Sequence, residues 1–174
     1  MSHPFTSDDD AEMRQVEKDV HTALGDLPLD FHSLLAVSNI FRAATAVRNH
    51  MEGSVLNGEQ LSWSAFVVLF VLRVWGPQES HQLAQEAGIT GGTLTGVLKT
   101  LEKKGLAQRR EHRTDRRRVV VSPTATGRRA VDRIMPRFND HEALVTGDLS
   151  QDQRDQLSHL LRTVLRTVDR VDGR

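Results

Sequence analysis

Apolar residues recur at helical spacing along most of the chain, a pattern that predicts a mainly helical protein. An amphipathic helix is expected over residues 31–53. A second helix over residues 63–75 is apolar on all sides, as expected for a helix at the centre of a small domain. A long helix is expected from Thr124, where Pro136 favours either a bend or the meeting of two helices.

The middle of the chain has the pattern of two short helices joined by a tight turn. Ala84 and Ala87 share one face of the first helix, and Gly88 provides a residue that can adopt a positive φ at the turn. Thr90 can cap the second helix. The apolar stripe of that helix consists of Leu94, Val97, Leu98 and Leu101. This pattern predicts a helix-turn-helix whose second helix leaves its opposite face for a partner.

Two strands are expected after Gly105, over residues 108–112 and 118–121, with a basic connection between them. Asp115 suits a turn because its carboxylate can accept hydrogen bonds from nearby backbone amides. One interpretation is a wing whose arginines enter a DNA groove, and the other is an ordinary solvated turn. The short distance from the helix-turn-helix favours the wing.

These elements predict a mainly α fold with a small β-hairpin wing. We expect a winged helix-turn-helix domain over residues 61–124 and a helical dimerisation region formed by residues 31–60 and 125–174. Residues 1–30 form an acidic N-terminal extension that is expected to be partly helical over 11–24. This extension could widen a dimer interface, line a pocket or simply cover the surface.

Charged residues are separated along the chain, although the 174 residues have a net charge of zero. Residues 99–118 contain nine Lys or Arg and three Asp or Glu. Residues 1–30 contain two Lys or Arg and eight Asp or Glu. A localised basic surface attracts phosphates even when the whole protein is neutral. The distribution therefore predicts double-stranded DNA as a partner of the middle of the chain.

Several short motifs follow one another in a characteristic order: residues 61–66 (LSWSAF), 90–97 (TGGTLTGV), 101–106 (LEKKGL), 115–117 (DRR) and 124–128 (TATGR). Together they resemble the MarR family over about residues 30–172. The resemblance implies a homodimeric winged-helix transcription factor, usually a repressor, often released from DNA by a small ligand. Many members have a basic residue where this chain has Gly96. Base contacts are therefore expected from Thr93, Thr95 and Lys99.

The expected DNA contacts combine the second helix of the helix-turn-helix with the basic hairpin. Small and hydroxylated residues let a helix approach a groove closely, and basic side chains bind phosphates or base edges. The predicted DNA-binding residues are Thr90, Gly92, Thr93, Thr95, Lys99, Lys103, His112, Arg113, Asp115, Arg116, Arg117 and Arg118. A winged helix used for protein or RNA contact, without operator recognition, is the alternative function.

The last helix has an apolar stripe whose members alternate in steps of four and three residues: Leu157, Leu161, Val164, Val168 and Val171. This 3.5-residue repeat suits a helix that packs lengthwise against another helix. The stripe predicts either a dimer interface or a cover for the chain's own core. The resemblance favours the dimer interface.

A small aromatic or anionic effector is the ligand that the resemblance implies. Members of the family often bind ligands between the helices expected at 31, at 63 and after the wing. The residues expected there are His32, Ser33, Trp63, Phe66, Phe70 and Arg73. Arg73 could pair bidentately with an aromatic carboxylate, or it could bind a neighbouring acid or a helix end.

Other functional classes have little support in the sequence. The absence of cysteine excludes thiol-based sensing, and the eight histidines show no metal-ligand spacing, so neither a metal site nor a cofactor is expected. Nucleotide-binding and hydrolase motifs are absent, so the protein is not expected to be an enzyme. Without a run of about 18 apolar residues or a basic leader, a cytoplasmic protein with no membrane partner is expected.

Overall fold

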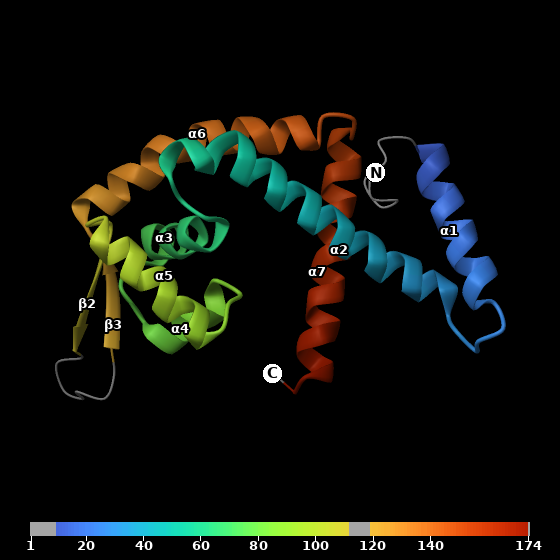
Figure 1. Ribbon diagram of the computed structural model, residues 1–174, viewed down its shortest axis with the longest axis horizontal. Helices are drawn as coiled ribbons and strands as arrows, with labels where there is room; N and C mark the ends of the chain where they lie inside the picture. The colour runs from blue at the N-terminus through green and yellow to red at the C-terminus, as the bar shows by residue number, and fades with distance from the viewer. Residues whose placement is uncertain (1–9, 112–118, 174) are drawn as a thin grey trace. The chain divides into compact units, whose positions relative to one another are not determined.

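The computed structural model describes residues 10–111 and 119–173. These residues belong to two compact units, 1–50 and 51–174. In the first unit, α1 (Asp10–Leu24) is followed by α2 (Phe31–Met51) (Figure 1). A hydrogen bond from Asn39 Nδ2 to Glu17 Oε1, 3.2 Å long, joins the two helices. The helix predicted within the acidic extension is therefore confirmed.

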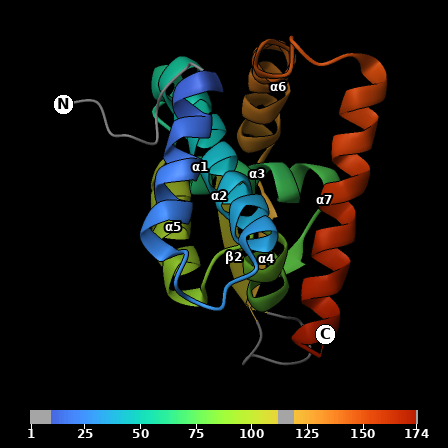
Figure 2. The same cartoon turned by 90° about the vertical axis from the view of Figure 1, so that its right-hand side faces the viewer.

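The second unit begins with irregular helical turns that lead into its central helix. A π-helical turn, η1 (Glu52–Leu56), and a 3-10 turn, η2 (Asn57–Glu59), precede α3 (Trp63–Trp75). The hydroxyl of Ser62 caps α3 by accepting a hydrogen bond from the Ala65 backbone amide. Helix α3 packs against α4 (Ser80–Glu86), α5 (Gly91–Lys103) and α6 (Ala125–Val145), as Figure 2 shows. It is the central buried helix that its sequence predicts.

Helices α4 and α5 form the predicted helix-turn-helix. Gly88 has a φ of +63° at the turn between them, where glycine avoids the steric clash of a Cβ atom. Thr90 caps α5 by accepting a hydrogen bond from the Thr93 backbone amide. On the inner face, Leu94, Leu98 and Leu101 are buried. Burial of this stripe leaves the opposite face of α5 exposed.

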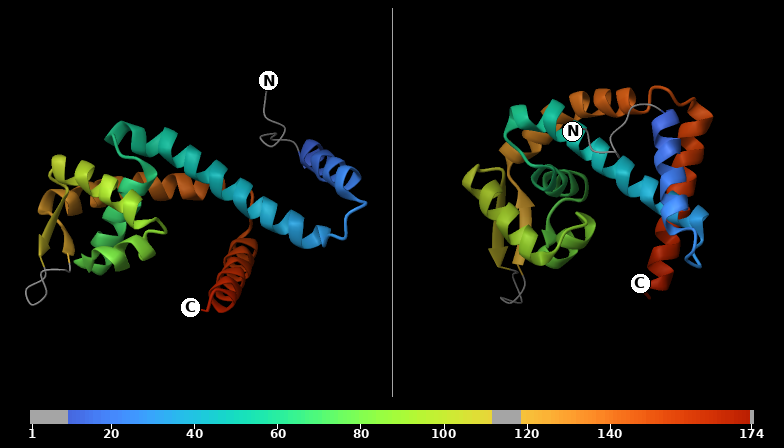
Figure 3. Two further views of the ribbon diagram at one scale, coloured as in Figure 1. Left: turned by 60° about the horizontal axis from the view of Figure 1, so that its bottom comes forward. Right: turned by 45° about the vertical axis from the view of Figure 1, so that its right-hand side comes forward.

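The strands of the described residues form a sheet of three, in the order β1–β3–β2. Strands β2 (Ala107–Glu111) and β3 (Val119–Pro123) pair antiparallel as the predicted hairpin, and β3 also pairs with β1 (Gln78–Glu79). Figures 1 and 3 show this hairpin beside α5. Strand β1 was not predicted because two residues are too short to show alternation.

Helix α6 continues through Pro136 as one helix, so the expectation that two helices might meet there is wrong. Helix α7 (Gln151–Val171) follows, and its start has a capping box in which Ser150 and Gln153 satisfy each other's backbone amides.

Among the described residues no single helix is long and apolar enough to cross a membrane; the bent pair 31–59 and 63–75 meets the length and composition criteria together.

The first turn of α6 lies directly against the connection between α5 and β2. The Leu106 carbonyl accepts hydrogen bonds from the Thr124 backbone amide and hydroxyl, at 3.0 and 3.2 Å. The single proton of that hydroxyl is shared with the Gly105 carbonyl, at 2.7 Å, and the hydroxyl oxygen accepts a hydrogen bond from the Gly127 amide. A Cβ atom at Gly127 would overlap the Leu106 carbonyl oxygen. Glycine is therefore required at this close approach, which we call the α6 clamp.

Replacing Gly127 with alanine should lower the free energy of unfolding by about 1–3 kcal/mol, because the added methyl group must displace backbone. Gly96→Ala is the matched control, since its Cβ meets open space within α5. That substitution should raise stability by about 0.5–1 kcal/mol. Urea unfolding followed by circular dichroism measures both. Equal stability of G127A and the wild type would contradict the clamp.

Candidate nucleic-acid interface

The exposed face of α5 has small and hydroxylated residues in its first two turns. Gly92, Thr93 and Thr95 are exposed. The hydroxyl oxygens of Thr90 and Thr93 lie 2.9 Å apart, and the Thr95 hydroxyl donates to the Gly91 carbonyl at 2.9 Å. Because its donor is used inside the helix, Thr95 offers a ligand an acceptor oxygen and a methyl group. Base edges in the major groove present matching amino donors and thymine methyl groups.

Basic side chains extend this face toward the end of α5. Lys99 and Lys103 are exposed, and neither ammonium has a hydrogen bond to the part of the chain that the structure describes. Two other cations within residues 99–118 are bound to other parts of the protein. Lys104 Nζ donates to the Gln60 carbonyl at 2.6 Å, and Arg109 pairs with Glu102. The sequence count of basic residues therefore overstates the charge that is free to bind phosphates.

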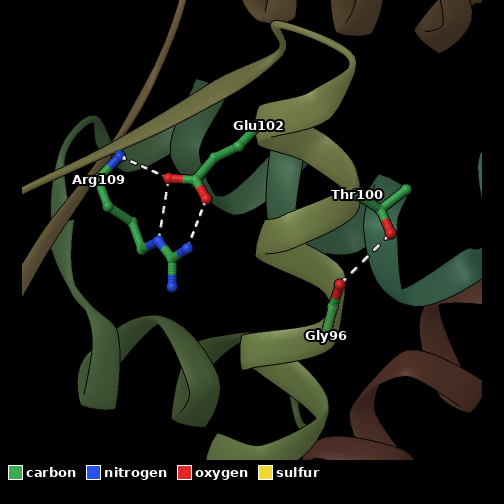
Figure 4. A network of polar contacts seen from close by, with 4 residues as sticks. All are labelled: Gly96, Thr100, Glu102 and Arg109. Atoms are coloured by element: carbon green, nitrogen blue, oxygen red, sulfur yellow. Dashed lines mark hydrogen bonds and ion pairs between the residues drawn. The ribbon is translucent and has the colours of Figure 1, made fainter.

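Glu102 and Arg109 form a bidentate pair that joins the last turn of α5 to β2 (Figure 4). Arg109 Nε donates to Glu102 Oε1 at 2.9 Å, and its terminal nitrogen donates to Oε2 at 2.6 Å. The Arg109 backbone amide also donates to Oε1, at 3.2 Å. Three hydrogen bonds thus fix the base of the hairpin relative to α5.

The hydrogen bonds from Arg109 hold the pKa of Glu102 below its ordinary value, and the positive charge acts in the same direction. The pKa of the Arg109 guanidinium is raised, first by the hydrogen bond to Glu102. Both side chains are about a third exposed, so solvent screens the pair. Its role is therefore mainly to set geometry.

The tip of the hairpin lies outside the described residues. The predicted DNA-binding residues there are His112, Arg113, Asp115, Arg116, Arg117 and Arg118. Their roles stay predictions. In the described part of the hairpin, β2 packs against α5 and pairs with β3 as far as Glu111 and Val119. The position of the strands is thus compatible with a wing.

The predicted ligand residues Trp63, Phe66 and Phe70 are brought together in the second unit. They line a hollow of about 190 Å³ between α3 and α6, with Met135 and Phe138 opposite. The Phe66 and Phe138 rings stack with centroids 4.7 Å apart, and the Trp63 and Phe138 centroids are 6.0 Å apart. The hollow is therefore aromatic and open to a flat ligand.

Arg73, the predicted partner of an anionic ligand, is bound to an acid of the protein. Its Nε donates to Asp132 Oδ1 at 2.7 Å. This is the alternative that the sequence left open, in which the arginine binds a neighbouring acid. The expected free guanidinium beside the aromatic residues is not what the structure shows.

His32 and Ser33, the remaining predicted ligand residues, lie at the start of α2 in the first unit. Their backbone amides donate to Asp30 Oδ1, and the Ser33 hydroxyl donates to Oδ2 at 2.6 Å. The Ser33 hydroxyl, followed by the Ser33 amide, lowers the pKa of Asp30. These contacts begin a helix, so the structure gives both residues a role in helix capping.

The apolar stripe of α7 is uncovered in the single chain. Leu161 is 38% exposed and Val171 is 79% exposed, with Leu157, Val164 and Val168 between these values. Helix α7 has no buried residue. The interpretation that this stripe covers the chain's own core is therefore wrong.

Sequence reasoning missed the residues whose partners are distant in the chain. Three basic side chains have such partners: Arg109 binds Glu102, Lys104 binds Gln60 and Arg73 binds Asp132. The local sequence around the partner residues does not predict these contacts. Gly127 was noted only as part of a motif, and Glu142 of the aromatic hollow was not noted. Within the described residues, no group of three or more His, Cys, Asp or Glu is placed to hold a metal ion.

The arrangement of α4, α5 and the β2–β3 hairpin defines a winged helix-turn-helix protein. The sequence profile of the MarR family matches residues 61–119, which contain α3, the helix-turn-helix and β2. The chain is 36% identical to the HTH-type transcriptional regulator YwaE of Bacillus subtilis over 156 aligned residues. The alignment covers 88% of this chain and 91% of YwaE. The chain belongs to the MarR family of transcriptional regulators.

Two further relatives have informative names. The transcriptional repressor NicR of Pseudomonas putida is 29% identical over 106 residues, which cover 61% of this chain and 67% of NicR. The structure of Bordetella bronchiseptica BpsR, whose DNA binding is regulated by 6-hydroxynicotinic acid, superposes on this chain with a TM-score of 0.70. The two sequences are 25% identical, and the superposition covers 75% of this chain and 98% of BpsR. The likeness thus extends beyond the winged module.

The Glu102–Arg109 pair predicts a defined pH dependence of stability. Because the folded-state pKa of Glu102 is lowered, its contribution is full above the unfolded value of about 4.3 and is lost as the pH falls through the folded-state pKa. Glu102→Gln should therefore destabilise the protein by about 0.5–1 kcal/mol at neutral pH and by less under acidic conditions.

Urea unfolding at a series of pH values measures this difference. Glu86→Gln, which replaces an exposed carboxylate on α4, is the control and should change stability little at any pH. A difference between wild type and E102Q that stays constant down to strongly acidic pH would contradict the ion pair.

Proposed function

We propose that the protein is a homodimeric, sequence-specific DNA-binding repressor that a small molecule releases from its operator. The observation that carries this proposal is the exposed face of α5, with Thr95 and Lys99 beside a hairpin fixed by Glu102 and Arg109. The alternative function, a winged helix for protein or RNA contact, has no such specific support.

The dimensions of α5 suit the major groove of DNA. Its 13 residues give a helix about 20 Å long, and the major groove, about 12 Å wide, admits a helix with small residues on the approaching side. Gly92 and Thr93 would enter first, Thr95 would offer an acceptor and a methyl group, and Lys99 would reach a phosphate or a guanine edge. Lys103 would bind the backbone further along.

The hairpin would contact the neighbouring groove. Because three hydrogen bonds anchor Arg109 to Glu102, the strands leave α5 in a fixed direction. The arginines predicted for the tip, Arg116 to Arg118, would then enter the minor groove. Asp115 would form the turn that presents them.

Dimerisation would come from the helical parts of the chain. The uncovered stripe of α7 is long enough for a helix–helix interface, since Leu157 and Val171 are four turns apart. A two-fold dimer presents two copies of α5 to half-sites about 34 Å apart. This division assigns residues 61–124 to DNA binding, and residues 31–60 with 125–174 to dimerisation.

Repression and release by a ligand are supported by relatives and by the aromatic hollow. NicR is named a repressor, and 6-hydroxynicotinic acid regulates DNA binding by BpsR. In this chain the hollow lies on α6, whose first turn forms the α6 clamp against Leu106. A ligand that shifts α6 would therefore move the base of the hairpin, which couples the hollow to DNA binding.

Lys99→Ala should weaken binding to operator DNA. If Lys99 contacts a phosphate, the slope of log affinity against log salt concentration should also become less negative by about one. Lys104→Ala is the matched control: its ammonium is bound to Gln60, so its loss should change the slope less. Fluorescence anisotropy with duplex from the protein's own upstream region, across a salt series, measures both. Unchanged affinity and slope for K99A would remove Lys99 from the interface, and no duplex binding by the wild type would favour protein or RNA contact.

Leu161→Glu should shift the protein from dimer to monomer, because it places a charge in the centre of the α7 stripe. His159→Glu adds the same side chain on the opposite face of α7 and should leave the dimer intact. Sedimentation velocity measures the mass of each variant. If L161E stays dimeric, or the wild type is a monomer, α7 is not the interface.

A further inference from the structure

The aromatic hollow between α3 and α6 has one charged residue in its lining, and that residue is acidic. Trp63, Phe66, Phe138 and their neighbours give it an apolar wall, and Glu142 supplies the charge. Its volume of about 190 Å³ suits a ligand with a single aromatic ring, since a cavity of about 150 Å³ suffices for benzene. The charge of Glu142 therefore bears directly on which ligands fit.

The two ends of the hollow differ in charge. Arg73 and Asp132 lie one helical turn beyond Phe70 and Met135, and their ion pair neutralises that end. Neither residue lines the hollow, and an incoming carboxylate would meet an arginine whose charge Asp132 already compensates. The arginine at that end is therefore already paired with an anion of the protein.

Glu142 lies at the other end, one turn beyond Phe138 on α6. Its Oε2 accepts a hydrogen bond from Asn139 Nδ2 at 2.9 Å, which orients the carboxylate. Its side chain is exposed, so a ligand can reach it from solvent. The nearby Trp63 ring offers a face that attracts cations. An ammonium group is thus favoured here, and a carboxylate would be repelled.

We propose that this hollow selects an aromatic amine in its protonated form, with the ring against Phe66, Phe138 and Trp63 and the ammonium on Glu142. The inference rests on the proposed function insofar as the hollow is the effector site. It assigns the opposite ligand charge to this chain from that of 6-hydroxynicotinic acid, the ligand named for BpsR.

Three single-ring probes of similar size and different charge test the proposal: 2-phenylethylamine, 2-phenylethanol and 3-phenylpropanoate. The protein has two tryptophans, and Trp75 is 57% exposed and outside the hollow, so a full-length Trp75→Phe background leaves Trp63 as the reporter. Titration of Trp63 fluorescence should give the tightest binding for the amine, weaker binding for the alcohol and the weakest for the acid.

Two variants separate charge from shape. Glu142→Gln should weaken amine binding about three- to tenfold and leave the alcohol unchanged, because it removes a charge-assisted hydrogen bond at an exposed site. Asp132→Asn should strengthen binding of the acid, because it removes the negative charge that compensates Arg73. Any of three results would overturn the proposal. The parent protein could bind the acid most tightly, E142Q could leave the amine affinity unchanged, or no probe could give a response.

Operator binding by the same protein, measured without ligand, distinguishes this inference from the proposed function. DNA binding with no response to the amine would leave the repressor proposal intact and reject the amine site. Amine binding that depends on Glu142, in a protein that binds no duplex, would support the site and reject the DNA-binding function.

Discussion

The close approach of α6 to the α5–β2 connection is the constraint on which the second unit depends. At the α6 clamp, one carbonyl of Leu106 accepts two hydrogen bonds from Thr124, and only glycine fits at position 127. The end of α5, the start of β2, the end of β3 and the start of α6 therefore meet at one point. A movement of α6 would act on the base of the hairpin, because hydrogen bonds join Thr124 to the Gly105 and Leu106 carbonyls.

The same part of the molecule shows how a protein with no net charge can present a basic surface. Four of the described cations in residues 99–118 fall into two groups with different roles. Lys104 and Arg109 are bound to Gln60 and Glu102 and hold the fold together, whereas Lys99 and Lys103 remain exposed on α5. The proposed binding to phosphates would therefore rest on Lys99 and Lys103, because Lys104 and Arg109 are already bound within the protein.

Local patterns predicted the helices, the cap at Thr90, the turn at Gly88 and the paired strands, because each depends on residues within one or two turns. They did not predict β1, which is too short to show a pattern, or the continuous path of α6 through Pro136. Of the candidate site, the exposed residues of α5 and the three aromatic residues of α3 were predicted, because both sets follow from helical spacing. The pairing of Arg109 with Glu102 was not, because hairpin geometry brings them together.

Arg73 shows most clearly why the sequence could not decide the chemistry of the hollow. Its position after an apolar helix favoured a partner carboxylate, and the structure does supply one, but from Asp132, 59 residues later in the chain. Once that pair forms, the charge that remains in the lining is that of Glu142. Aromatic spacing on α3 supplies one wall of the hollow, whereas the contact of Arg73 with Asp132 and the position of Glu142, both on α6, decide which charge remains in its lining.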